Sequence, residues 1–138
     1  MNQSDKDNKQ LSKDKTDLGK LIKKIRTRNN TDAISMRKLA EAVEIPPSNM
    51  KYIEDGINAP SPAVYEKIIK HLHPSDKERA KLDRLYSAIR GTPPPDVCEI
   101  IINNKGMNNA LRKISGHTLS EQQISELDAM LNSFAAKT

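Results

Sequence analysis

Apolar residues recur along this chain at intervals of three and four, the spacing that places side chains on one face of an α-helix. No segment shows the alternation of apolar and polar residues that is typical of a half-buried strand. The fold class predicted from this pattern is therefore all-α. The apolar stripes run over Leu18–Ile25, Met36–Val43, Met50–Ile53, Val64–Leu72 and Leu82–Ile89.

Prolines and glycines separate these stripes into short helices. Pro46 and Pro47 cannot lie inside a helix, but Pro47 suits the first turn of a helix that follows. Gly56 stands where that next helix is expected to end. Residues 34–61 are thus predicted to form two short helices joined by a tight turn, with Met50 and Ile53 of the second helix facing inward.

Residues at the two ends of the chain differ from this central pattern. Residues 1–16 contain one apolar residue besides Met1, which predicts a disordered tail. Thr92-Pro93-Pro94-Pro95 predicts a stiff linker. The expected organisation is a tail at 1–16, a five-helix domain at 17–91, a linker at 92–95 and a small helical module at 96–138. The module would dimerise the protein or bind a partner.

Composition limits the kind of core and the compartment. Of the 138 residues, 36% are hydrophobic and only 3% are aromatic, so aliphatic side chains must build the core. Cys98 is the single cysteine, which excludes an intrachain disulfide and favours a reducing, cytoplasmic location. No apolar run approaches the roughly 20 residues of a membrane helix, so no membrane association is expected.

Catalytic and metal-binding patterns are weak in this sequence. His71 and His73 form an H-x-H pair with no further ligand to complete a metal site. Cys98 and His117 lack an orienting group, so a packing role for the thiol is the stronger interpretation. We therefore expect no enzyme activity, no cofactor and no metal.

Charge is distributed unevenly along the chain. The net charge is +5, and Lys and Arg outnumber Asp and Glu before the proline-rich segment but not after it. A basic front suits nucleic-acid binding, although lysine-rich solvated surfaces give the same pattern.

The segment from Ile34 to Ser61 carries an ordered set of motifs. Leu39-Ala40 lies in the first helix, Val43 and Ile45 flank the turn, and Ile53-Glu54-Asp55-Gly56 ends the second helix before Asn58-Ala59-Pro60-Ser61. In this order and spacing the segment resembles the helix-turn-helix of the phage-repressor-like family, which includes lambda repressor and Cro and is also called the xenobiotic-response-element family. The resemblance covers residues 17–73 and implies a five-helix, lambda-repressor-like domain that binds double-stranded DNA.

Helical geometry and this resemblance together indicate the contacts with DNA. Side chains on the outer face of the second helix are candidates for base contacts, because a helix fits the major groove: Ser48, Asn49, Lys51 and Tyr52. The resemblance implies phosphate contacts at the start of the first motif helix and on neighbouring backbone: Arg37, Lys38, Asn58, Arg28 and the position of Met36.

Three positions depart from the family pattern. Met36 replaces the usual glutamine, which removes one hydrogen-bonding group. Glu44 replaces the usual turn glycine, so either the turn differs or Glu44 adopts a left-handed conformation. Pro47 replaces a residue that is often polar and base-facing.

The expected function is that of a transcriptional regulator, a homodimeric repressor bound to an inverted repeat near a promoter. A dimer is expected because one helix-turn-helix contacts too few base pairs to be selective. The dimer seam is predicted on one apolar stripe, formed by Leu82, Leu85, Tyr86 and Ile89. The same stripe could instead cover the core. The alternative is an antitoxin or inhibitor that binds a protein partner through residues 96–138, with DNA binding secondary.

Overall fold

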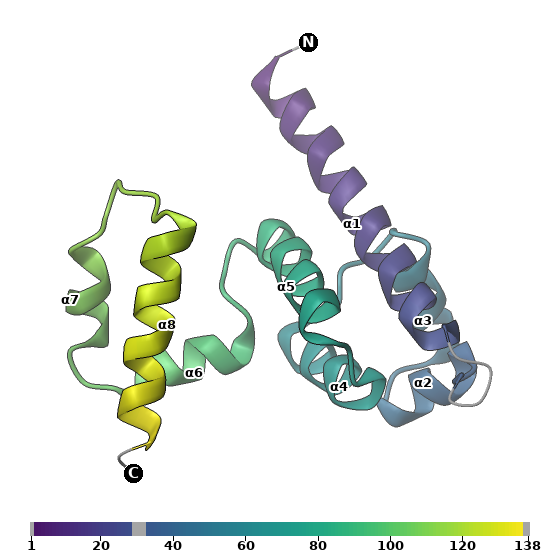
Figure 1. The fold of residues 1–138 in the computed structure, drawn as a ribbon. Coiled ribbons are helices and arrows are strands. Elements are labelled where there is room, and N and C mark those ends of the chain that lie inside the picture. The colour runs from purple at the N-terminus through teal and green to yellow at the C-terminus, as the bar shows by residue number, and fades with distance from the viewer. Residues whose placement is uncertain (1, 29–32, 137–138) are drawn as a thin grey trace. The chain divides into compact units, whose positions relative to one another are not determined.

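The structure is a computed structural model that describes residues 2–28 and 33–136, and over these residues it contains eight α-helices and no strand (Figure 1). The predicted all-α class is confirmed. The helices are α1 (Gln3–Thr27), α2 (Met36–Ala42), α3 (Pro47–Glu54), α4 (Pro62–Leu72), α5 (Asp76–Arg90), α6 (Pro95–Asn103), α7 (Met107–Arg112) and α8 (Glu121–Ala136).

The chain divides into two compact units, Met1–Ile100 and Ile101–Thr138. The division falls after the predicted proline linker rather than in it. Pro94 is buried, and Pro95 is the first residue of α6, a place where a proline costs no helical hydrogen bond. Gly91, in the left-handed conformation, caps α5, and the prolines that follow lead into α6, which begins within the first unit.

Helix α1 begins much earlier than the predicted end of a disordered tail at residue 16. The side chain of Asn2 accepts a hydrogen bond from the Asp5 amide at 2.9 Å and caps the helix. Hydrogen bonds four residues apart follow, among them Gln10 to Asp14 at 2.9 Å and Lys13 to Asp17 at 2.8 Å. The disorder prediction considered only the low apolar content of the tail and missed these local interactions.

The core of the first unit lies around the second half of α1. Leu18, Ile22 and Ile25 are buried there, together with side chains from α2, α3, α4 and α5. Helix α1 packs against both α5 and α3, and α2 packs against α3 and α4. In Figure 1 the first half of α1 extends away from the other helices of this unit.

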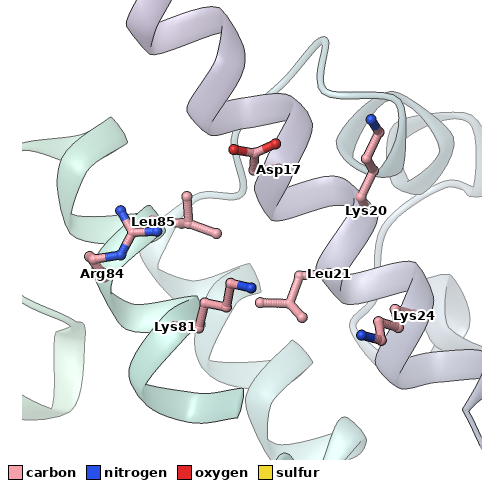
Figure 2. A pocket seen from close by; sticks show the side chains of 7 residues that line it. All are labelled: Asp17, Lys20, Leu21, Lys24, Lys81, Arg84 and Leu85. Atoms are coloured by element: carbon pink, nitrogen blue, oxygen red, sulfur yellow. The ribbon is translucent and has the colours of Figure 1, made fainter. Parts of the chain in front are cut away.

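The predicted dimer seam on α5 is not a free surface. Leu82, Leu85 and Tyr86 are at most 1% exposed within one chain, and Ile89 packs against the same core. Figure 2 shows Leu85 of α5 and Leu21 of α1 between their two helices. The Tyr86 ring stacks on Tyr65 of α4, with ring centroids 4.1 Å apart. This stripe covers the core, so the seam prediction is corrected.

A buried ion pair joins α1 to α3. Arg26 donates from Nε to Glu54 Oε2 and from Nη2 to Glu54 Oε1, both at 2.8 Å. Its third bond runs from Nη1 to the Ile34 carbonyl oxygen at 2.9 Å. Both side chains are almost fully buried, at 9% and 5% exposed. Arg26 therefore holds two segments in place: the C-terminal end of α3 and the segment that leads into α2.

Replacing Arg26 with methionine should destabilise the fold strongly. Arg26→Met keeps most of the side-chain volume but leaves the Glu54 carboxylate buried without a cation. We expect the free energy of unfolding in urea to fall by about 3–5 kcal/mol. Arg28→Met is the control, because its pair with Glu78 is 39% and 25% exposed and should contribute about 1 kcal/mol or less. Equal losses in the two variants would contradict the role assigned to Arg26.

Candidate nucleic-acid interface

Helices α2 and α3 meet at a tight turn, as the sequence predicts. Ser35 caps α2 by accepting a hydrogen bond from the Lys38 amide at 3.1 Å. The Ile45 amide donates to the Ala40 carbonyl at 3.0 Å and closes the turn. Pro46 is extended, and Pro47 opens α3 at its first helical position. Leu39 and Ala40 are fully buried, and the small side chain of Ala40 lets the two helices approach closely.

Glu44 adopts the left-handed conformation that was one of the two predicted alternatives for this turn. Its φ is 61°, a region that costs a residue with a Cβ atom about 1–2 kcal/mol. The Lys67 ammonium of α4 donates a hydrogen bond to its carboxylate. This bond, aided by the positive charge, holds the pKa of Glu44 below its ordinary value.

Substitutions at Glu44 test the backbone of this turn. Glu44→Gly and Glu44→Ala both remove the pair with Lys67, so they differ only in tolerance of a positive φ and in chain flexibility. We expect the glycine variant to be more stable in urea denaturation by about 1 kcal/mol. An alanine variant of equal or greater stability would show that the turn has another conformation in solution.

Helix α3 presents a polar face to solvent and an apolar face to the core. Met50 and Ile53 are 0% and 5% exposed, so their predicted inward orientation is confirmed. The predicted base-contact residues all lie on the exposed side: Ser48, Asn49, Lys51 and Tyr52. Tyr52 is 44% exposed, and Lys51 forms a 3.2 Å ion pair with Asp55 one turn later.

Two glycines allow α3 to lie close to α1. A Cβ atom on Gly19 would stand 2.4 Å from the carbonyl oxygens of both Ile53 and Glu54. Gly56, with a φ of 78°, would bring a Cβ atom to 2.6 Å from the Cα atom of Thr16. Both contacts are with backbone, so a larger residue at either position would force α3 away from α1.

The predicted phosphate-contact residues have different surroundings. Arg37, Lys38 and Asn58 are exposed. Met36 is half-buried and packs against the core, so its side chain supplies packing rather than a hydrogen bond. Arg28 is bonded to Glu78 and, at 3.2 Å, to the His73 carbonyl. A phosphate contact at Arg28 would therefore compete with two partners inside the chain.

A shallow pocket connects the outer face of α3 with the loop before α4. It has a volume of about 220 Å³ and brings together two of the predicted DNA contacts, Asn49 and Asn58, beside Ser61. Arg90 holds this loop from α5: its guanidinium donates to the Pro60 carbonyl at 2.8 and 3.0 Å and to the Ala59 carbonyl at 3.1 Å.

The helix-turn-helix segment itself is electrically balanced. Its exposed side chains carry three positive charges, on Arg37, Lys38 and Lys51. They carry three negative charges, on Glu41, Glu44 and Asp55. The fourth carboxylate, Glu54, is buried on Arg26. Phosphate attraction at this surface therefore depends on a few individual side chains and not on a broad basic patch.

A concentration of positive charge lies elsewhere, in a groove between α1 and α5 (Figure 2). The groove has a volume of about 310 Å³, an apolar floor of Leu21 and Leu85, and one carboxylate, Asp17. Its cations form no ion pair with any residue in the described ranges: Lys20, Lys24, Lys81 and Arg84. No residue of α3 lines it, so a test of α3 must be separated from general attraction to this groove.

Sequence analysis did not find the residues that hold α3 and the loop before α4 in place. Arg26 and Glu54 are 28 positions apart in the chain, and Arg90 lies 30 positions from Pro60. Glu54 was recognised only as part of the motif that ends α3. Local periodicity contains no signal for such long-range pairs.

Neither metal ligands nor membrane spans are found in the part of the chain that the structure describes. No group of three or more His, Cys, Asp or Glu side chains lies close enough together there to hold a metal ion. Among the same residues, no helix has both the length and the apolar character needed to cross a membrane.

Comparison with protein-family models, with curated proteins and with solved structures gave no match for this chain.

Proposed function

We propose that this protein is a sequence-specific regulator of transcription that binds double-stranded DNA through the outer face of α3. The observation that carries the proposal is the division of α3 into two faces. Met50, Ile53 and Glu54 attach the helix to the core, while the opposite side carries only short or amphipathic polar groups. The resemblance of residues 17–73 to the phage-repressor-like family, with its lambda-repressor-like arrangement, supports the same interpretation.

The exposed groups on α3 suit the edges of base pairs. The amide of Asn49 can both donate to and accept from adenine, and Ser48 can bond to either kind of base. The Tyr52 ring can contact a thymine methyl group while its hydroxyl bonds to a base or phosphate. Lys51 can reach phosphate or guanine. A helix about 10–12 Å across fits a major groove about 12 Å wide.

Repression is the proposed outcome of binding. A protein on an inverted repeat near a promoter blocks polymerase, and the gene for the protein itself is one candidate target. The experiment is to measure binding of the full chain to duplexes that tile the region upstream of its gene. We expect the protein to bind one duplex at least about 1000-fold more tightly than a scrambled control. Equal binding to every duplex would contradict this choice of target.

Asn49→Ala should weaken binding to the preferred duplex by about 10-fold or more, because one bidentate base contact contributes about 1–3 kcal/mol of discrimination. Asn108→Ala is the matched control, since it removes the same amide from an exposed position on α7. Fluorescence anisotropy with the preferred and scrambled duplexes measures both effects. Loss of affinity for both duplexes alike would show that Asn49 does not read bases.

The dependence of affinity on salt separates α3 from the groove between α1 and α5. Three exposed cations in the motif predict a slope of log affinity against log salt of roughly −3 per subunit. Lys51→Ala should make this slope shallower by about 1. Lys81→Gln with Arg84→Gln should leave specific binding unchanged. If that double variant abolishes binding while Lys51→Ala does not, the α1–α5 groove carries the interaction.

A protein-binding function is the second candidate, favoured by the apolar surface of the second unit. In residues 101–136, no side chain is buried. An antitoxin or inhibitor would use this surface to bind its target and would bind DNA only secondarily. It would retain partner binding in the Asn49→Ala variant and show no preference among duplexes.

A further inference from the structure

The second unit exposes its apolar side chains instead of burying them. Each of its large aliphatic and aromatic residues in the described range is at least partly open to solvent. Eight of them are strongly exposed, and their exposed fractions range from 40% at Ile114 to 79% at Ile102. The others in this set are Leu111, Ile124, Leu127, Met130, Leu131 and Phe134.

A unit of this size with no buried side chain is rarely stable alone. It spans Ile101–Thr138, and chains shorter than about 40 residues normally need a disulfide, a metal or association with another chain. Cys98 is the single cysteine of the sequence and lies outside the unit. The described residues offer no metal site. Association is therefore the remaining source of stability.

The apolar positions of α8 have the spacing of a coiled-coil seam. Ile124, Leu127, Leu131 and Phe134 follow one another at intervals of three, four and three residues. These are successive a and d positions of a heptad, with Ile124 and Leu131 at a. The a and d residues of such a stripe can pack against the same residues of a second copy, and Met130 at a g position widens the apolar face beside them.

Charge limits how a second copy of the chain can pair. The described residues of the unit carry three positive charges at Lys105, Arg112 and Lys113. The three negative charges lie on α8, at Glu121, Glu126 and Asp128. The unit is neutral as a whole, but every charged residue of α8 in the described range is acidic. A pair of α8 helices must therefore keep these carboxylates apart.

The residues beside the seam distinguish the two possible directions of pairing. Glu121 and Asp128 occupy e positions, and Gln123 and Met130 occupy g positions. Parallel helices place e beside g of the partner, which sets Gln123 next to Asp128 of the other copy. Antiparallel helices place e beside e and bring the acidic residues together. The flanks therefore favour the parallel pair.

We propose that two copies of this chain associate through a parallel, two-fold pairing of α8, with Ile124, Leu127, Leu131 and Phe134 in the seam. This association follows from burial and spacing alone and does not require that α3 binds DNA. The α8 pairing replaces the dimer seam that was predicted on α5, whose residues lie in the core. Its consequence for recognition rests on the proposed function: a two-fold dimer presents two α3 helices to an inverted repeat.

The test is sedimentation of the full chain without DNA, for the natural sequence and two variants. Leu131→Asp places a charge in the seam and should raise the dimer dissociation constant about 30-fold or more. Ala129→Asp adds the same charge at the f position of the same helix and should leave the constant unchanged. A monomeric natural chain, or equal effects of both substitutions, would overturn the proposal.

Disulfide trapping tests the direction of pairing even where an aspartate disturbs α8. In a Cys98→Ser background, Phe134→Cys should give a covalent dimer under mild oxidation, because parallel pairing brings the two copies of position 134 together. Ala129→Cys, on the outer face, should not. Absence of the Phe134→Cys dimer in a chain that sediments as a dimer would overturn the parallel arrangement. DNA binding is measured separately, so failure of one proposal leaves the other testable.

Discussion

Arg26 extends from the last turn of α1 to the end of α3, where its guanidinium bonds both carboxylate oxygens of Glu54 and the Ile34 carbonyl. Two charges removed from water are tolerated only when they are paired with good geometry, so this contact fixes the relative position of three segments. Gly19 permits it, because any Cβ there would collide with the α3 backbone. These contacts with α1 thus fix the position of α3 and the direction in which its outer face points.

The two functional surfaces proposed here lie in separate units of the chain. The first unit buries most of its large apolar side chains and exposes polar groups on α3, a surface suited to reading a polar ligand. The second unit buries none of its described side chains and exposes an apolar stripe, a surface suited to association. Together, the two proposals combine weak individual contacts on α3 with the use of two copies at once, an arrangement that increases affinity without any new contact to DNA.

Local patterns predicted the parts of the fold that depend on local geometry. Periodicity placed Met50 and Ile53 inward and Asn49 and Tyr52 outward, and the structure agrees because a helix of known register leaves little choice. The stripe on α5 was identified correctly as apolar, but periodicity does not say what covers it. In the structure, α1 and α4 cover it. The helical tail and the pairing of Arg26 with Glu54 were missed, since neither produces an apolar repeat. Whether Asn49 contacts a base stays a prediction.

Selection of bound duplexes from a random-sequence pool by the full chain tests the central claim most directly. The pool contains every short site, so the result does not depend on a guess about the target gene. The account predicts enrichment of an inverted repeat whose half-sites are separated by about one helical turn, roughly 34 Å, and loss of that enrichment in the Asn49→Ala variant. A pool that remains random after repeated selection, although the protein is folded and dimeric, would contradict sequence-specific recognition by α3.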